Sequence, residues 1–154
     1  MDIPSKIFKS YDIRGIYPQE INERFAVPIT RSIYKLISDQ LDTTEPLTIA
    51  VGRDMRLSSP AIFEEISKTL VNLGNGIKIV RRSETGLVKI GQSTGMNDIR
   101  DGSINGVDLP NPGNGNITKK EGVVKDEVQN ALKIAGDPQI KEFKIVADAA
   151  NAVG

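Results

Sequence analysis

The sequence contains no cysteine and no histidine among its 154 residues. The absence of cysteine excludes disulfides, thiolate catalysis and cysteine-ligated metals. The absence of histidine removes the commonest general base at neutral pH and the commonest metal ligand. Any proton transfer must therefore use an aspartate, glutamate, lysine, tyrosine or water.

Aromatic residues, net charge and long apolar runs are also scarce. Tyrosine and phenylalanine occur three and four times and tryptophan is absent, so the core must consist mainly of isoleucine, valine, leucine and alanine. Twenty basic and twenty acidic residues cancel, which argues against a broad surface for nucleic acid or anionic membranes. No apolar run is long enough to span a bilayer, and no basic start followed by an apolar run marks a secretory signal. We therefore expect a cytoplasmic protein.

The apolar pattern predicts helices that alternate with extended segments. Helical spacing follows Asn22, and Pro28 should kink this helix or make it start late. Ser58-Ser59-Pro60 should begin a second helix, with a hydroxyl as cap and proline in the first turn, and Gly74 should end it. A third helix is expected over 123–135, ended by Gly136-Asp137-Pro138.

Extended segments are expected at 6–8, 47–51, 77–81 and 143–147. The order strand, helix, strand, helix indicates a layered α/β domain. Residues 101–116 contain four glycines and two prolines and are predicted to form a long loop.

Three motifs, in this order, resemble the first domain of the α-D-phosphohexomutases, the phosphomannomutase/phosphoglucomutase family. They are Phe8-Lys9-Ser10-Tyr11-Asp12-Ile13-Arg14-Gly15, Val51-Gly52-Arg53-Asp54-Met55-Arg56-Leu57-Ser58-Ser59 and Asn75-Gly76-Ile77-Lys78-Ile79-Val80. Thr94-Gly95-Met96-Asn97-Asp98-Ile99-Arg100 supports them downstream, and Asp148-Ala149-Ala150-Asn151-Ala152-Val153-Gly154 resembles the opening of the family's second domain. The resemblance implies a mixed sheet with helices on its faces, here shortened.

The family exchanges a phosphoryl group between C1 and C6 of hexose phosphates through a phosphoserine. In the family that serine lies in a loop like Thr-Ala-Ser-His-Asn-Pro, between the second and third motifs. Here Leu73-Gly74 runs directly into Asn75-Gly76, so the serine loop is deleted, and a chain without histidine has not moved it elsewhere. The family's Asp-Gly-Asp-Gly-Asp loop, which binds Mg²⁺, belongs to its second domain and is also missing.

The resemblance assigns accessory roles to three residues. Arg14 matches an arginine near the transferring phosphoryl group, Lys78 matches the lysine after Asn-Gly, and Tyr11 lies in the loop of Arg14. The resemblance implies that Arg14 and Lys78 assist catalysis and that all three contact the substrate, while no residue is expected to bind metal. Taken alone, Arg14 is typical of a surface ion pair and Lys78 of a solvated strand, and both alternatives stay open.

Two attractive clusters are interpreted as structural. Arg53, Asp54 and Arg56 should shape the turn before the second helix. Ser58 and Ser59 are better explained as helix caps than as nucleophiles, because no general base is visible near them.

These observations predict a domain resembling phosphohexomutase domain I over residues 1–140, deleted around 74–75, and the start of a second domain over 141–154. By resemblance the function is phosphohexomutase-related, an isomerase of the intramolecular phosphotransferase type, but this truncated chain should be inactive alone. Its expected partners are hexose phosphates and a second copy, through an uncovered sheet edge. The alternative is a non-catalytic module that oligomerises or weakly binds phosphosugar, and Mg²⁺ is expected only in the full-length family.

Overall fold

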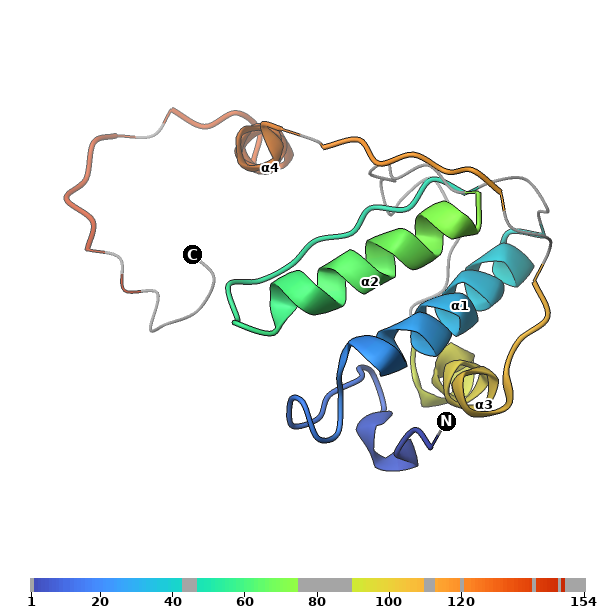
Figure 1. Ribbon diagram of the computed structural model, residues 1–154. Coiled ribbons are helices and arrows are strands. Elements are labelled where there is room, and N and C mark those ends of the chain that lie inside the picture. Colours follow the sequence, from blue (N-terminus) through green and yellow to red (C-terminus); the bar gives the residue numbers. More distant parts are fainter. Residues whose placement is uncertain are drawn as a thin grey trace. The chain divides into compact units, whose positions relative to one another are not determined.

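The computed structural model describes residues 2–42, 47–74, 90–109, 113–119, 121–139, 141–146 and 148 (Figure 1). The chain divides into two compact units, Met1–Thr118 and Lys119–Gly154, which are described separately. The domain boundary predicted near residue 140 stays a prediction.

Helix α1, Glu23–Gln40, confirms the first predicted helix. It begins at Asn22, whose side-chain oxygen accepts a hydrogen bond from the N–H of Phe25 at 3.2 Å. This cap satisfies one of the free donors of the first turn and sets the start of the helix before Pro28. The predicted late start is therefore wrong, since Pro28 lies inside α1.

Helix α2, Ser59–Asn72, confirms the second predicted helix, with proline in its first turn. Gly74 follows it with a φ of +81°, a conformation that glycine adopts without a steric penalty, as predicted for the helix end. The predicted hydroxyl cap is wrong for Ser58, whose side chain makes no capping hydrogen bond.

Helix α3, Asn97–Asn105, follows a short π-helical turn, Gln92–Met96. The prediction of a loop over 101–116 is therefore wrong for its first five residues. Burial explains the difference, because Ile99 is 1% exposed and fixes the helix against the core. Within α3 the hydroxyl of Ser103 donates to the Ile99 carbonyl at 2.5 Å.

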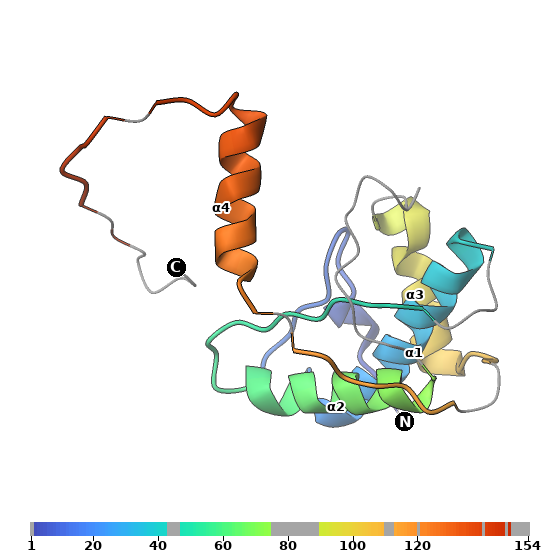
Figure 2. The same ribbon diagram turned by 90° about the horizontal axis from the view of Figure 1, so that it is seen from above.

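Helix α1 packs against both α2 and α3, and Figures 1 and 2 show it lying between them. Two clusters of buried residues hold α1 in place. One consists of Ile3, Ile7 and Ile29, and the other of Tyr34, Leu47 and Leu70. Burial of apolar area thus joins α1 to the N-terminal segment through the first cluster and to α2 through the second.

The predicted mixed sheet is wrong for the residues that the structure describes. Residues 6–8 contain most of a 3₁₀ helix, Ser5–Ile7, and the described parts of 47–51 and 143–147 form no strand. In the described ranges, pairing is limited to isolated β-bridges such as Phe8–Ile13. A strand requires a neighbour that supplies a ladder of hydrogen bonds, and among the described residues none of these segments has one.

The predicted segment 77–81 lies outside the described residues. The predicted homo-oligomer relied on a sheet edge, so it stays a prediction without that support.

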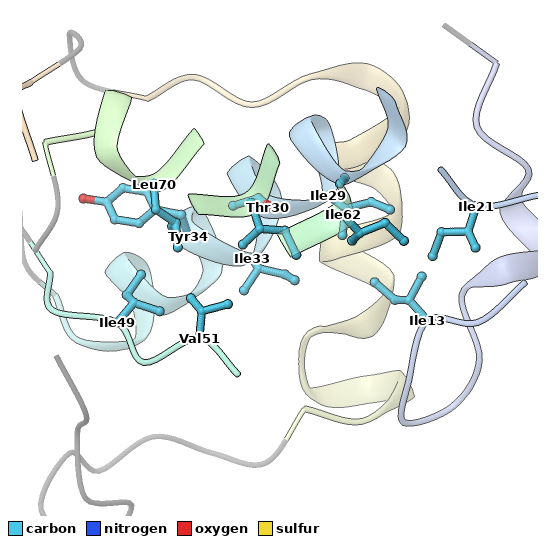
Figure 3. A pocket seen from close by; sticks show the side chains of 12 residues that line it. Ile13, Ile21, Ile29, Thr30, Ile33, Tyr34, Ile49, Val51, Ile62 and Leu70 are labelled. Carbon is cyan, nitrogen blue, oxygen red and sulfur yellow. The ribbon is translucent and has the colours of Figure 1, made fainter. Parts of the chain in front are cut away.

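An apolar cavity of about 230 Å³ lies between α1, α2 and the extended segment of Ile49 and Val51 (Figure 3). Its wall is aliphatic apart from the side chains of Thr30 and Tyr34. In Figure 3, Ile33 and Ile62 come from the two helices, while Ile49 and Val51 approach from the extended segment. Side-chain packing between these helices is therefore incomplete on this face.

The second unit contains helix α4, Val123–Ile134, which confirms the third predicted helix. Gly136 and Asp137 both follow it with positive φ values, as expected for a helix end. Most of its apolar residues are exposed within the described structure, as is Phe143 of the segment beyond it; Val124 and Ile134 are each 79% exposed. None of the described helices has the length and apolar character needed to cross a membrane.

Candidate functional site

The first motif, Phe8–Gly15, forms a tight hairpin after the 3₁₀ turn. Main-chain hydrogen bonds close it, from Lys9 N to Asp12 O at 2.8 Å and from Arg14 N to Ile7 O at 3.0 Å. The hairpin therefore presents Tyr11 at its tip and Arg14 on its returning arm.

Arg14 is held by its neighbour and still faces solvent. Its Nε–H donates to the Oδ1 of Asp12 at 3.0 Å, and its side chain is 72% exposed. A guanidinium has five N–H donors in a planar fork, so the bond to Asp12 leaves both terminal nitrogens for a ligand. The Arg14–Asp12 pair is the surface ion pair expected if Arg14 has no role in binding. It also fixes the orientation of the guanidinium group.

Tyr11 is 82% exposed and lies beside Gly91. A Cβ atom at Gly91 would lie 3.6 Å from Cε1 of the Tyr11 ring, which is ordinary contact distance. The ring thus combines an exposed hydroxyl group with one edge against the segment that leads into α3.

Gly15 and Glu20 fix the base of the hairpin. A Cβ atom at Gly15 would lie 2.9 Å from the Cβ of Glu20, so the chain there has no room for a side chain. The carboxylate of Glu20 accepts a hydrogen bond from Ile16 N at 3.0 Å and pairs with Lys6. The Lys6 ammonium group and the Ile16 N–H lower the pKa of Glu20.

A second contact joins the segment after the hairpin to α1. The hydroxyl of Tyr17 donates a hydrogen bond to the carboxylate of Glu23, the first residue of the helix. This hydrogen bond raises the pKa of Tyr17 and lowers that of Glu23. Acidic Glu23 also suits the positive end of the helix dipole.

The second motif is organised around Asp54. Its carboxylate accepts hydrogen bonds from the hydroxyl of Ser59 and from Arg56 N, the latter at 3.1 Å, and pairs with the Arg56 guanidinium at 3.3 Å. The Ser59 hydroxyl and the Arg56 N–H lower the pKa of Asp54. These contacts tie the turn to the start of α2, which supports the structural interpretation of this cluster.

A polar cavity of about 300 Å³ lies beside the hairpin. Its wall combines hairpin residues with the start of α3, namely Phe8, Lys9, Ser10, Gln92, Met96, Asn97 and Arg100. Sequence reasoning did not select Lys9, Ser10, Gln92 or Arg100 as site residues. The sequence did contain one indication of this cavity, because the hairpin and the start of α3 both belong to motifs that resemble the same family.

Lys78 lies outside the described residues, so its role stays a prediction, either as a contact to substrate or as a solvated lysine. Over the described ranges, no three aspartates or glutamates come together as a metal ion would require. The described residues therefore do not fit the Mg²⁺ of the family.

Comparison with known proteins identifies the relatives of the chain. Residues 5–94 match the family described as phosphoglucomutase/phosphomannomutase, alpha/beta/alpha domain I. A phosphomannomutase/phosphoglucomutase of Pseudomonas putida is 37% identical over 86 residues, which are 56% of this chain and 17% of the relative. A phosphomannomutase of Vibrio cholerae is 29% identical over 141 residues, which are 92% of this chain and 28% of the relative.

A solved structure shows a likeness in fold. It is a phosphoglucomutase/phosphomannomutase family protein from Burkholderia thailandensis, with a TM-score of 0.64 and 17% identity, and the likeness covers 92% of this chain and 38% of that one. The chain therefore spans less than two fifths of each of these three proteins.

Proposed function

Because the chain belongs to the phosphoglucomutase/phosphomannomutase family, we propose that it is a phosphohexomutase-related module that binds hexose phosphates at the Phe8–Gly15 hairpin. One observation carries the proposal: Arg14 is exposed and is oriented by Asp12. An oriented guanidinium can donate two parallel hydrogen bonds to the oxygens of a phosphate.

The rest of the hairpin suits the same ligand. Tyr11 adds a hydroxyl that can donate to a phosphate or sugar oxygen. Lys78 enters the proposal through the family resemblance, as a positive charge near the sugar hydroxyl. Phosphoryl transfer depends on positioning and on neutralising the charge of the moving group, and these residues would serve both needs.

We expect the chain alone to give little or no turnover. In the sequence, Asn75 follows Gly74 directly, where the family places the serine loop, and no histidine is present anywhere. This gap is internal, so it does not depend on where the chain begins or ends. Without the serine no group in this chain carries the phosphoryl between C1 and C6.

Magnesium is part of the proposal only for the full-length family. The acidic loop that binds it there belongs to the family's second domain, and the described residues offer no acidic cluster. We therefore expect hexose phosphate binding to be unchanged when Mg²⁺ is removed.

The alternative is a non-catalytic module that assembles with other copies. The exposed apolar residues of α4 favour it, because buried apolar area drives association. Sedimentation of the full chain at increasing concentration tests this alternative.

The direct test measures conversion of glucose 1-phosphate and mannose 1-phosphate to the 6-phosphates, with Mg²⁺ and a hexose bisphosphate present. A folded sample should show no turnover above background while calorimetry shows binding, and Arg14→Gln should weaken that binding. Arg56→Gln is the matched control, since it removes an exposed arginine that also pairs with a nearby aspartate. Turnover that is lost in Arg14→Gln would contradict the expected inactivity, and no binding of either sugar phosphate would overturn the proposal.

A further inference from the structure

The polar cavity beside the hairpin brings together two parts of the chain that are distant in the sequence. Lys9 and Ser10 come from the first arm and turn of the hairpin, and Gln92, Asn97 and Arg100 from the π-turn and α3. A volume of about 300 Å³ is at the lower end of the range, roughly 300–1,000 Å³, that is typical of small-molecule sites. A small ligand is therefore the class that fits.

Arg100 is held in place from two sides. Its Nε–H donates to Asp101 at 2.7 Å and its Nη1 donates to the side-chain oxygen of Asn97 at 3.1 Å. Of its five N–H donors, three are left for another acceptor. The guanidinium is thus oriented before any ligand arrives, which lowers the entropic cost of binding.

Lys9 supplies a positive charge to the cavity wall. Two nearby carboxylates are held by other cations, Asp101 by Arg100 and Glu20 by Lys6, although Lys9 also lowers the pKa of Glu20. Among the described residues, neither of these ion pairs includes Lys9, and the side chains of Ser10 and Gln92 line the same cavity. The ammonium group of Lys9, the three remaining N–H donors of Arg100 and two neutral side chains therefore line one small space, which favours an anion.

The geometry points to a second phosphate site in this cavity, in which Lys9, Ser10 and Arg100 bind the phosphate group of a phosphate monoester. The ligand class rests on the proposed function, while the charge and donors of the cavity stand independently of it. Lys9 acts as a point charge, and Arg100 donates in the plane of its fork. Arg14 is on the same hairpin as Lys9 but does not line the cavity. The phosphate site in the cavity would therefore be additional to the one at Arg14.

The test is calorimetric titration of the full chain with inorganic phosphate, glucose 1-phosphate and glucose as separate probes. The variants are Lys9→Gln and Arg100→Gln, with Lys35→Gln and Arg56→Gln as controls that remove the same charges from exposed ion pairs in the same unit. We expect both phosphate-containing probes to bind about tenfold or more weakly to the cavity variants, because each loses a charge-assisted hydrogen bond. Glucose should not bind, and the control variants should match the original chain.

The outcomes separate this site from the hairpin. If Arg14→Gln weakens glucose 1-phosphate while Lys9→Gln and Arg100→Gln leave both phosphate probes unchanged, the cavity assignment is wrong and the proposed function survives. If inorganic phosphate binds through Lys9 and Arg100 but the sugar phosphates bind no better than phosphate and are insensitive to Arg14→Gln, the cavity assignment holds and the proposed function fails. Thermal unfolding of each variant without ligand checks that lost binding does not reflect lost folding.

Discussion

The first unit contains two cavities of similar size and opposite chemistry. The cavity of about 230 Å³ between α1 and α2 is lined almost entirely by aliphatic side chains, whereas the cavity of about 300 Å³ beside the hairpin is lined mainly by lysine, arginine, serine and amides, together with Phe8 and Met96. Volume alone therefore does not distinguish a site from a packing defect. Chemistry does, because an apolar wall has nothing to orient a phosphate, while the polar wall supplies charge and donors.

The two regions also differ in how they are held. The apolar cavity is bounded by buried and partly buried aliphatic side chains, such as Ile33, whose packing contacts are not directional. The hairpin is closed by directional main-chain hydrogen bonds and by the bond from Arg14 to Asp12, and the residues that follow it hydrogen-bond to Glu20 and Glu23. Stability and ligand binding should accordingly respond to different substitutions.

The largest expected effect is on the free energy of unfolding, through a residue that lines the apolar cavity. Leu70 is 3% exposed, and Leu70→Ala should lower the free energy of unfolding by about 2–5 kcal/mol, because it removes buried methyl groups and enlarges a cavity. Urea denaturation measures the change. Leu57, which is fully exposed, gives the matched control, and Leu57→Ala should change stability by less than about 0.5 kcal/mol. Equal losses from the two variants would contradict the burial that the structure assigns to Leu70.

The second largest expected effect is on ligand binding at the hairpin. Arg14→Gln should weaken glucose 1-phosphate binding about tenfold to a hundredfold, since it removes charge-assisted hydrogen bonds to phosphate. The free energy of unfolding should change by less than about 0.5 kcal/mol, because Arg14 is exposed. Calorimetry and urea denaturation on the same samples separate the two quantities, and a large loss of stability without loss of binding would reverse the assigned role.

Filling the apolar cavity should have a smaller effect of opposite sign. Ala26 lies on α1 and lines the cavity, so Ala26→Val should stabilise the fold by about 0.5–1 kcal/mol. Ala131→Val on exposed α4 is the control, since it has the same cost in helix propensity without a cavity to fill. Destabilisation by Ala26→Val beyond that of the control would mean that the helix face is already tightly packed.

These contrasts show why some features were predictable from the sequence. Helices α1, α2 and α4 depend on local signals, namely apolar spacing, Pro60, and the glycines Gly74 and Gly136 at helix ends. The sheet failed as a prediction because strand pairing depends on partners elsewhere in the chain, and residues 47–51 lack a ladder in the described structure.

The positions of the candidate site residues were predictable only in part, and their roles stay a prediction. Tyr11 and Arg14 share one short motif, and the structure places both on one exposed hairpin. The cavity of Lys9 and Arg100 was not found, because it forms only where α3 packs beside the hairpin, and α3 itself was partly predicted as loop. Gly102 and Asp101 suggested a loop, yet burial of Ile99 kept them helical.

The smallest expected effect is on the pH dependence of stability. Hydrogen bonds from Ser59 and Arg56 lower the pKa of Asp54 below its value in the unfolded chain. Its contribution to stability is therefore complete above the unfolded pKa, near pH 4, and is lost as pH falls through the lower folded pKa. The stability difference between the original chain and Asp54→Asn should be constant above about pH 5 and shrink below about pH 4. A difference that grows on acidification would contradict this assignment.

The most direct test of the account is a titration of the full chain with glucose 1-phosphate, followed by backbone amide chemical shifts. The account predicts that the shifts concentrate at Tyr11–Gly15 and Gln92–Arg100, on the polar side, while the amides around Ile62–Leu70 beside the apolar cavity stay unchanged. Shifts confined to the apolar side, or no shifts at millimolar ligand, would contradict the claim that the hairpin of this chain binds phosphosugars.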